Sequence, residues 1–174
     1  MKLGFPIWEK TRRDSDFRVI DNAERGGTYG MIQLILVSHG QLGLALIEAS
    51  QLLYGQAQGL YSLSLSPDQS TSTFQKNLQS IIQRTGSQTL IMTDLEGGTP
   101  CNQSLLGTMN QPDVLVLSGM NLPMLLEALN CRHEYALPEL ARHLLDVGKT
   151  NILNSTLRFQ EQLKDEGELD DFMN

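Results

Sequence analysis

Residues 31–40 have the sequence MIQLILVSHG, an apolar run that ends in His39 and a glycine. A short, β-branched run bounded by glycine is typical of a buried strand in a parallel sheet. A second such run, residues 89–92, is soon followed by Asp94, which opens the loop sequence DLEGGTPCN. In an open α/β sheet, functional groups collect beyond the carboxyl ends of the strands, where loops lead into helices. We therefore expect His39 and Asp94 at that edge of one sheet.

From residue 31 onward, strand patterns alternate with helix patterns. Further strands are predicted at residues 60–65 and 114–117. Helices are predicted at residues 44–54, from 67 to about 86, at 122–129, and from 137 to about 163. Another helix is predicted to start at Thr99, with Thr99 as the N-cap and Pro100 in the first turn. This alternation predicts an α/β fold with an open, mainly parallel sheet and helices on both faces. The residues alone leave the strand order open.

The first 30 residues differ from the rest of the chain. They contain six Lys and Arg and five Asp and Glu, and their apolar residues follow neither the helix nor the strand period. We expect residues 1–30 to be a disordered extension, or the product of an over-early start codon with Met31 as the natural initiator. The alternative is a short ordered arm centred on residues 17–20. The folded domain is expected to span residues 31–164, followed by an acidic tail at residues 165–174.

Charge and hydropathy exclude several classes of protein. Residues 31–174 hold seven Lys and Arg against fifteen Asp and Glu, whereas a nucleic-acid-binding surface needs basic side chains. No apolar stretch approaches the roughly 18 residues of a membrane helix, and early charges interrupt any signal-peptide core. Cys101 and Cys131 lie outside close metal-ligand spacing, so reduced thiols are expected. We therefore expect a cytoplasmic protein without nucleic acid, membrane insertion, metal or cofactor.

A histidine and a carboxylate at this edge of the sheet suit phosphoryl transfer. The imidazole must be neutral to attack phosphorus with a ring-nitrogen lone pair, and a carboxylate on the other ring N–H holds that tautomer. Asp94 is the candidate for this orienting role towards His39. The transferred group spreads its charge over three oxygens, so positioning and hydrogen-bond donors matter most.

Donors for the phosphate are expected from the backbone around both loops, and from a helix N-terminus that aims its positive end at the same place. The expected phosphate-binding residues are Gly40, Gly97, Gly98 and Thr99. Each feature also has a plainer explanation, because two glycines suit any tight strand-to-helix turn and a histidine at a strand end is commonly a surface residue. His133 and His143 have no carboxylate loop nearby and are expected to be structural.

Three motifs together resemble the IIA component of the mannose family of the bacterial phosphoenolpyruvate-dependent sugar phosphotransferase system. They are the strand-Ser-His-Gly start, the Asp-x-x-Gly-Gly-Thr-Pro-x-Asn loop at 94–102, and SGMNLPMLLE at 118–127. The resemblance covers residues 31 to 148. It implies strand order 2-1-3-4, counted from residue 31, which places the first and third strands side by side and brings His39 to Asp94.

The resemblance also implies a function and partners. His39 would accept phosphate from the histidine phosphocarrier protein HPr and pass it to a IIB component, and through IIB to the membrane IIC/IID complex. A homodimer is implied too, and the apolar segment 120–126 offers more apolar surface than a four-stranded sheet needs. Two alternatives stay open: the phosphoryl-donor subunit of a dihydroxyacetone kinase, which shares the strand-Ser-His opening, and a regulatory relative that binds partners without transferring phosphate.

The chain departs from the family pattern at two positions in the second loop. Glu96 stands where the family usually has an aromatic or other apolar residue, and Leu95 lacks a hydroxyl that some members place after the aspartate. A carboxylate at position 96 would repel a phosphoryl group if it pointed inward and would be harmless if it pointed to solvent. The regulatory alternative rests on Glu96 alone.

Overall fold

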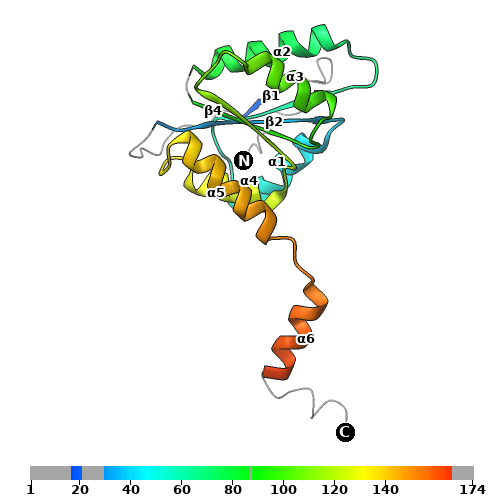
Figure 1. Ribbon diagram of the computed structural model, residues 1–174, viewed down its shortest axis with the longest axis vertical. Helices are drawn as coiled ribbons and strands as arrows, with labels where there is room; N and C mark the ends of the chain where they lie inside the picture. Colours follow the sequence, from blue (N-terminus) through cyan, green and yellow to red (C-terminus); the bar gives the residue numbers. More distant parts are fainter. Residues whose placement is uncertain (1–16, 21–29, 87, 166–174) are drawn as a thin grey trace, which may run out of the picture.

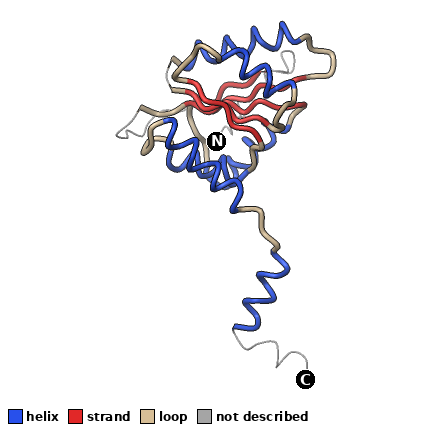
Figure 2. The backbone as a smooth tube through the Cα atoms, in the orientation of Figure 1, coloured by secondary structure: helices blue, strands red, loops and turns tan. Residues whose placement is uncertain are grey.

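The computed structural model describes residues 17–20, 30–86 and 88–165, which include one sheet with helices on both faces (Figure 1). The strands are β1 (Phe17–Ile20), β2 (Gln33–His39), β3 (Leu60–Leu65), β4 (Thr89–Thr93) and β5 (Val114–Ser118). Their order across the sheet is β1-β3-β2-β4-β5. All neighbouring pairs are parallel except β1 with β3, which is antiparallel. Figure 2 shows the strands side by side between the helices.

The four strands after residue 30 have the expected order. Counted from residue 31, β3, β2, β4 and β5 are the second, first, third and fourth strands, so the 2-1-3-4 order is confirmed. In the β2–β4 ladder, Val37 lies opposite Thr93. Because this ladder is parallel, the chain leaves both strands at the same edge of the sheet. The loops that carry His39 and Asp94 therefore begin side by side.

Part of the N-terminal extension forms the fifth strand. β1 pairs with β3 from Phe17 opposite Leu63 to Ile20 opposite Leu60. This is the short arm given above as the alternative to a disordered extension, and the remainder of the extension, apart from Gly30, lies outside the described residues. An edge strand is joined through backbone N–H and C=O groups. Such pairing leaves no apolar period in the sequence by which to recognise it.

The helices divide into two layers. They are α1 (Leu42–Tyr54), α2 (Thr71–Thr85), α3 (Thr99–Thr108), α4 (Leu122–Cys131), α5 (Leu137–Thr150) and α6 (Ser155–Asp165). α2 and α3 cover one face of the sheet, and α1, α4 and α5 cover the other (Figure 1). Leu34 and Leu36 of β2 belong to the core under α1, α4 and α5, whereas Ile35 and Val37 belong to the core under α2. The unbroken apolar run of β2 reflects this cover on both faces.

Three helices begin one or a few residues away from the expected position, and the first of them, α1, begins at Leu42 and not at residue 44. α2 begins after Ser70, whose Oγ accepts a hydrogen bond from the backbone N–H of Thr73 at 3.2 Å, so the cap lies beyond the expected start at residue 67. In α3 the cap is Gly98, which has extended backbone angles, and Thr99 is already the first helical residue. The expectation that Thr99 is the N-cap is therefore corrected, while Pro100 lies in the first turn as expected.

The long C-terminal helical region is interrupted between α5 and α6. Asn151 donates from Nδ2 to the carbonyl of Val147 at 2.9 Å, and Asn154 Oδ1 accepts from the backbone N–H of Leu157 at 3.1 Å. Asparagine side chains that bond to local backbone groups in this way end one helix and cap the next. α6 consequently points away from the sheet (Figure 1). None of the helices within the described ranges is long and apolar enough to span a membrane.

A buried arginine joins α4 to the sheet at the edge opposite His39. Arg132 Nη1 donates to the carbonyls of Ile32 at 3.3 Å and Gly59 at 3.1 Å, and its Nη2 donates to the carbonyl of Gln58. Ile32 and Gly59 directly precede β2 and β3. Burial lowers the pKa of Arg132 to about 10, which still leaves the guanidinium charged at neutral pH. The guanidinium charge of Arg132 is thus stabilised by the dipoles of backbone carbonyl groups.

Candidate functional site

The site is centred on a hydrogen-bonded histidine and aspartate. His39 ends β2, and Asp94 follows directly after β4. One carboxylate oxygen of Asp94, Oδ2, accepts from His39 Nδ1 at 2.9 Å and from the backbone N–H of His39 at 2.8 Å. The other oxygen, Oδ1, accepts from the backbone N–H of Leu95 at 2.9 Å. The carboxylate is thus held by three donors and in turn holds the imidazole.

The orientation of the ring leaves one nitrogen for chemistry. An ionised carboxylate only accepts hydrogen bonds, so Nδ1 carries the ring proton and Nε2 of the neutral ring carries the lone pair. The side chain of His39 is 47% exposed, whereas that of Asp94 is 11% exposed. A reacting group can therefore approach Nε2 from solvent while the orienting carboxylate stays covered.

The imidazole lies against the backbone of Gly98. A Cβ atom added there would lie 2.8 Å from Cε1 of His39, 3.6 Å from Nε2 and 3.2 Å from the carbonyl oxygen of Leu95. The first of these distances is shorter than carbon atoms tolerate. Gly98 therefore leaves the space that the ring occupies, and its own N–H donates to the carbonyl of Leu95 at 3.2 Å.

Gly97 and Thr99 lie on either side of this glycine. Gly97 has a φ of 74°, in the left-handed region that glycine adopts without strain. Thr99 is the first residue of α3, and the first intrahelical bond runs from Asn102 N–H to the carbonyl of Gly98 at 2.9 Å. The N–H groups ahead of that bond have no acceptor within the helix and form the positive end of its dipole. This end of α3 lies beside the His39 ring.

Gly40, the fourth expected phosphate-binding residue, follows His39 directly. It has a φ of 53°, and its N–H donates to the carbonyl of Leu65 at 3.0 Å. Its own carbonyl accepts from Ser38 Oγ at 3.3 Å. Both backbone groups thus hold the loop, and the space beside the glycine remains open, because a Cβ there would meet nothing within 4 Å.

Two residues that support the loops were not singled out from the sequence. Ser38 is fully buried, and its Oγ accepts from the backbone N–H of Gly43 at 2.9 Å while contacting Gly40. Asn102 donates from Nδ2 to the carbonyl of Gly97 at 2.8 Å and so ties the first turn of α3 to the loop before it. The sequence did contain a signal for them, because both are polar residues inside the quoted motifs. Their hydrogen-bond partners, however, are set only when the loops fold.

Glu96 is exposed and contacts α3. Its Oε2 accepts from the thiol of Cys101 at 3.6 Å, a long hydrogen bond that the sulfur atom permits. Cys101 is buried, and its sulfur also lies 3.1 Å from Ser118 Oγ. The carboxylate that contacts His39 is that of Asp94. Glu96, one of the two residues that depart from the family pattern, therefore bonds to the first turn of the helix.

The other two histidines lie away from this edge. His133 Nε2 is 3.5 Å from Glu134 at the surface. His143 of α5 is 2.6 Å from Oε1 of Glu127 on α4. The sequence indicated no carboxylate loop near His143, and the helix packing supplies a carboxylate instead. Burial, together with the nearby carboxylates, raises the pKa of the neighbouring thiol, Cys131, to about 11.

Comparison with known proteins places the chain in a family. A family model named EIIA-man, described as PTS system fructose IIA component, matches residues 33–145. The sorbose-specific EIIA component of the phosphotransferase system (PTS) of Lacticaseibacillus casei is 31% identical over 118 residues, which are 67% of this chain and 85% of that protein. Its counterpart from Klebsiella pneumoniae is 28% identical over 115 residues, 66% of this chain and 84% of that protein.

Solved structures with the same fold carry related names. The mannose/sorbose specific IIA subunit from Enterococcus faecalis has a TM-score of 0.65 at 29% identity, with 72% of this chain and 95% of that chain covered. EIIA from Streptococcus agalactiae has a TM-score of 0.69 at 27% identity, with 73% and 99% covered. The family match includes both His39 and Asp94. The expected resemblance is confirmed, and the chain belongs to the EIIA-man family of sugar phosphotransferase system IIA components.

Proposed function

We propose that this chain is a phosphoryl carrier that holds phosphate on Nε2 of His39 between a donor protein and an acceptor protein. The observation that carries the proposal is the 2.9 Å hydrogen bond between His39 Nδ1 and Asp94 Oδ2, which leaves the Nε2 lone pair free. About half of the His39 side chain is exposed, so another protein's active-site residue can reach it.

The transfer step uses the two groups in different ways. The Nε2 lone pair of His39 forms the new N–P bond as the bond from phosphorus to the donor's histidine nitrogen breaks, and that bonding pair returns to the donor nitrogen. Positive charge then develops on the His39 ring. The Asp94 carboxylate stabilises this charge and keeps the Nδ1 proton in place without accepting it. Onward transfer to the acceptor reverses the same changes.

The phosphoryl oxygens are held by the loop before α3 and by the start of that helix. Gly97 and Thr99 supply backbone N–H groups and the Thr99 hydroxyl, and the positive end of α3 favours the negative charge. Gly98 and Gly40 act differently, because their N–H groups bond to Leu95 and Leu65. These two glycines contribute space, for the imidazole and for the incoming group respectively.

Family membership supports the identity of the partners. We infer that HPr is the donor and that a IIB component is the acceptor, through which phosphate reaches a membrane IIC/IID complex. One relative, the mannose-specific EIIAB component of Escherichia coli, is named for both an A and a B component, and the matched 105 residues are 32% of its length. A IIA unit next to its B acceptor in one chain is consistent with direct transfer between the two.

Phosphorylation in a reconstituted system tests the proposal. The full chain is incubated with phosphoenolpyruvate, enzyme I and HPr, and intact mass is measured before and after mild acid, which cleaves phosphohistidine. We expect one phosphoryl group that is acid-labile and that a cognate IIB protein removes. His39→Ala should take up none while keeping its circular dichroism spectrum.

His133→Gln and His143→Gln are the matched controls, since each removes an imidazole from the same chain. Both should be phosphorylated as the wild type is. Phosphate that persists in His39→Ala, or that is lost in either control, would contradict the assignment of His39. No uptake by the wild type with an active donor would instead favour the regulatory alternative.

A further inference from the structure

We propose that Glu127, Cys131 and His143 form a binding site for a zinc-class divalent cation at the contact between α4 and α5. One potential ligand atom from each residue lies within 4.8 Å of those of the other two. The site lies outside the phosphoryl-transfer site and was not expected from the sequence, where the three residues show no metal-ligand spacing.

Helix geometry explains how the three side chains meet. Glu127 and Cys131 are four residues apart on α4 and so share one face of the helix. His143 comes from α5, which packs against α4, and its Nε2 is 2.6 Å from Oε1 of Glu127. Ligands about 2.0–2.3 Å from a tetrahedral zinc ion are roughly 3.3–3.8 Å apart. Small side-chain rotations that move the ligand atoms by on the order of 1 Å therefore suffice to place an ion between them.

The donor set selects the class of cation. An imidazole nitrogen, a thiol sulfur and a carboxylate oxygen are ligands of zinc, whereas calcium and magnesium take oxygen ligands. The Cys131 residue is 4% exposed, while about a third of each of the other two side chains is exposed. A fourth position can therefore face solvent and hold a water molecule. Binding would release the thiol proton, as it does whenever cysteine ligates a metal.

The imidazole is already oriented by a neighbouring aromatic ring. Tyr135 stacks on His143 with ring centroids 5.3 Å apart and an interplanar angle of 17°. Stacking on one face restricts the rotation of the His143 ring and so reduces the reorganisation needed on binding. Cys131 Sγ donates to the backbone carbonyl of Glu127, one turn earlier on α4, at 3.0 Å.

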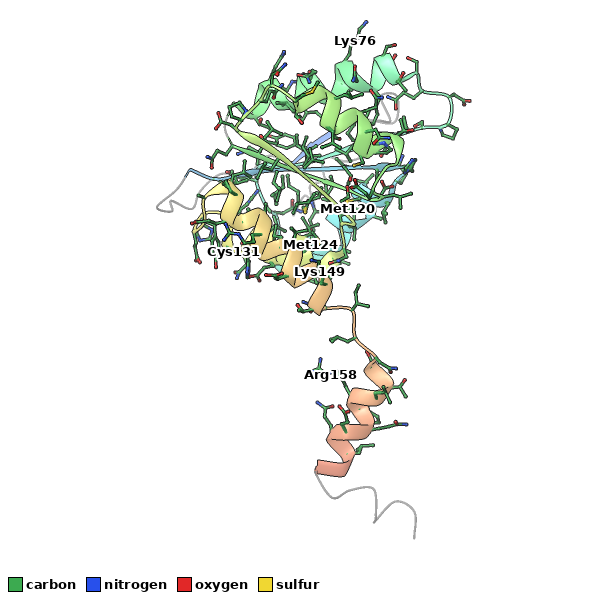
Figure 3. The ribbon with its side chains drawn as sticks, in the orientation of Figure 1. Lys76, Met120, Met124, Cys131, Lys149 and Arg158 are labelled. Atoms are coloured by element: carbon green, nitrogen blue, oxygen red, sulfur yellow. The ribbon has the colours of Figure 1, made fainter. Side chains whose placement is uncertain are left out.

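The site lies at the far edge of the domain from His39. Cys131 is followed by Arg132, which bonds to carbonyls at the amino ends of β2 and β3, whereas His39 is at the carboxyl end of β2. Figure 3 shows Met124 of α4 between Cys131, which ends that helix, and Met120, which precedes it. An ion here would link α4 to α5 and leave the phosphoryl-transfer groups untouched. Because it binds the folded state, it would raise the unfolding temperature as its concentration rises.

Metal titration of the full chain tests the site. Chelator-stripped, reduced protein is titrated with zinc against a chromophoric chelator, and separately with cobalt to follow the thiolate-to-cobalt charge-transfer absorption. We expect one equivalent of zinc, a charge-transfer band with cobalt, and a higher unfolding temperature with zinc. Cys131→Ser should abolish the band and weaken zinc binding by at least roughly tenfold, since even outer-shell partners of metal ligands are worth that much.

Matched variants separate this site from the rest of the chain. Cys101→Ser removes the other cysteine, and His133→Gln removes a histidine that has a different carboxylate partner; both should bind zinc as the wild type does. His143→Gln, at a partly exposed position, provides the test if Cys131→Ser fails to fold. Absence of one-to-one binding, or a charge-transfer band that survives in Cys131→Ser, overturns the proposal. Phosphorylation of His39 in the same samples is an independent readout, so either proposal can fail alone.

Discussion

At the scale of single residues, we expect the aspartate to decide which nitrogen of the histidine reacts. Asp94 bonds to both the ring and the backbone of His39. Asp94→Asn keeps the size of the side chain but allows the amide to donate to Nδ1, which favours the wrong tautomer. Such changes in catalytic triads cost about 10⁴-fold. Here we expect phosphoryl uptake to slow by roughly 10–10³-fold, because the backbone donors around the phosphate remain. Quenched-flow transfer from phospho-HPr measures the rate.

Glu96→Gln is the control for a change of charge in the same loop. Glu96 bonds to the thiol of Cys101 and is exposed. Because exposed charges interact only weakly with their surroundings, this variant should transfer phosphate within about twofold of the wild-type rate. Equal losses in both variants would show that net charge of the loop, and not the orientation of His39, controls the reaction. A wild-type rate in Asp94→Asn would show that another group orients the ring.

Gly98 is expected to be as sensitive as the aspartate for a steric reason. In Gly98→Ala the new methyl group would lie 2.8 Å from Cε1 of His39, so the half-exposed ring must move away from Asp94. Displacements of about 1 Å in a catalytic group cost up to roughly 10²-fold in rate. We expect a loss of that order with little change in thermal unfolding. Gly30→Ala, where a Cβ meets nothing within 4 Å, should leave the rate unchanged.

At the scale of elements, the first strand is expected to be dispensable for chemistry. Removing residues 1–30 deletes β1 and exposes the edge of β3, but leaves the β3-β2-β4-β5 order and the site intact. The lost edge ladder should lower the free energy of unfolding by about 1–3 kcal/mol. Urea denaturation measures the change, and intact mass should still show phosphorylation. An insoluble or unphosphorylated truncated chain would mean that the extension is required by the domain.

A buried charge contributes to the contact of α4 with the sheet, beside the apolar packing of that helix. Arg132→Met keeps much of the length of the side chain but removes the donor to the carbonyls of Ile32 and Gln58. The carbonyl of Gly59 keeps its bond from the backbone N–H of Leu34 at 2.8 Å. Buried acceptors deprived of a partner are costly, so we expect about 2–4 kcal/mol lower unfolding free energy by urea denaturation. The exposed Arg142 provides the comparison, and Arg142→Met should change stability by less than about 0.5 kcal/mol. A similar loss of unfolding free energy in both variants would show that the buried hydrogen bonds of Arg132 add nothing specific to stability.

At the scale of the whole molecule, the apolar surface left uncovered suggests self-association. Met120, Met124 and Leu125 are buried in the chain's own core, so the segment expected to form an interface is already covered. Exposed apolar side chains lie instead at the end of α1 and after α5, for example Leu52 and Phe159. We expect light scattering at micromolar concentration to give twice the 19.4 kDa of the monomer. A monomer mass across that range would contradict a homodimer.

Much of the domain could be predicted from local pattern. The apolar runs of β2 and β4, the glycines after helices and the proline at the start of α3 are signals carried by neighbouring residues, and the elements lie close to the expected places. The strand order was not available from these signals. It came from the resemblance, because local pattern contains no information on which strand pairs with which. β1 was expected only as the alternative of a short arm, and the break before α6 was missed, because backbone pairing and asparagine caps leave weak periodicity.

The sequence by itself determined the strands, the two loops at their ends and the residues that those loops carry, because burial and turn chemistry are written in short stretches. Only the tertiary structure decided that Gly98 accommodates the His39 ring and that Arg132 binds Ile32, 100 positions away. It also decided that His143 meets Glu127 across two helices. These contacts form when the packing of α3, α4 and α5 brings side chains from distant positions within bonding distance, and no local period in the chain encodes that distance.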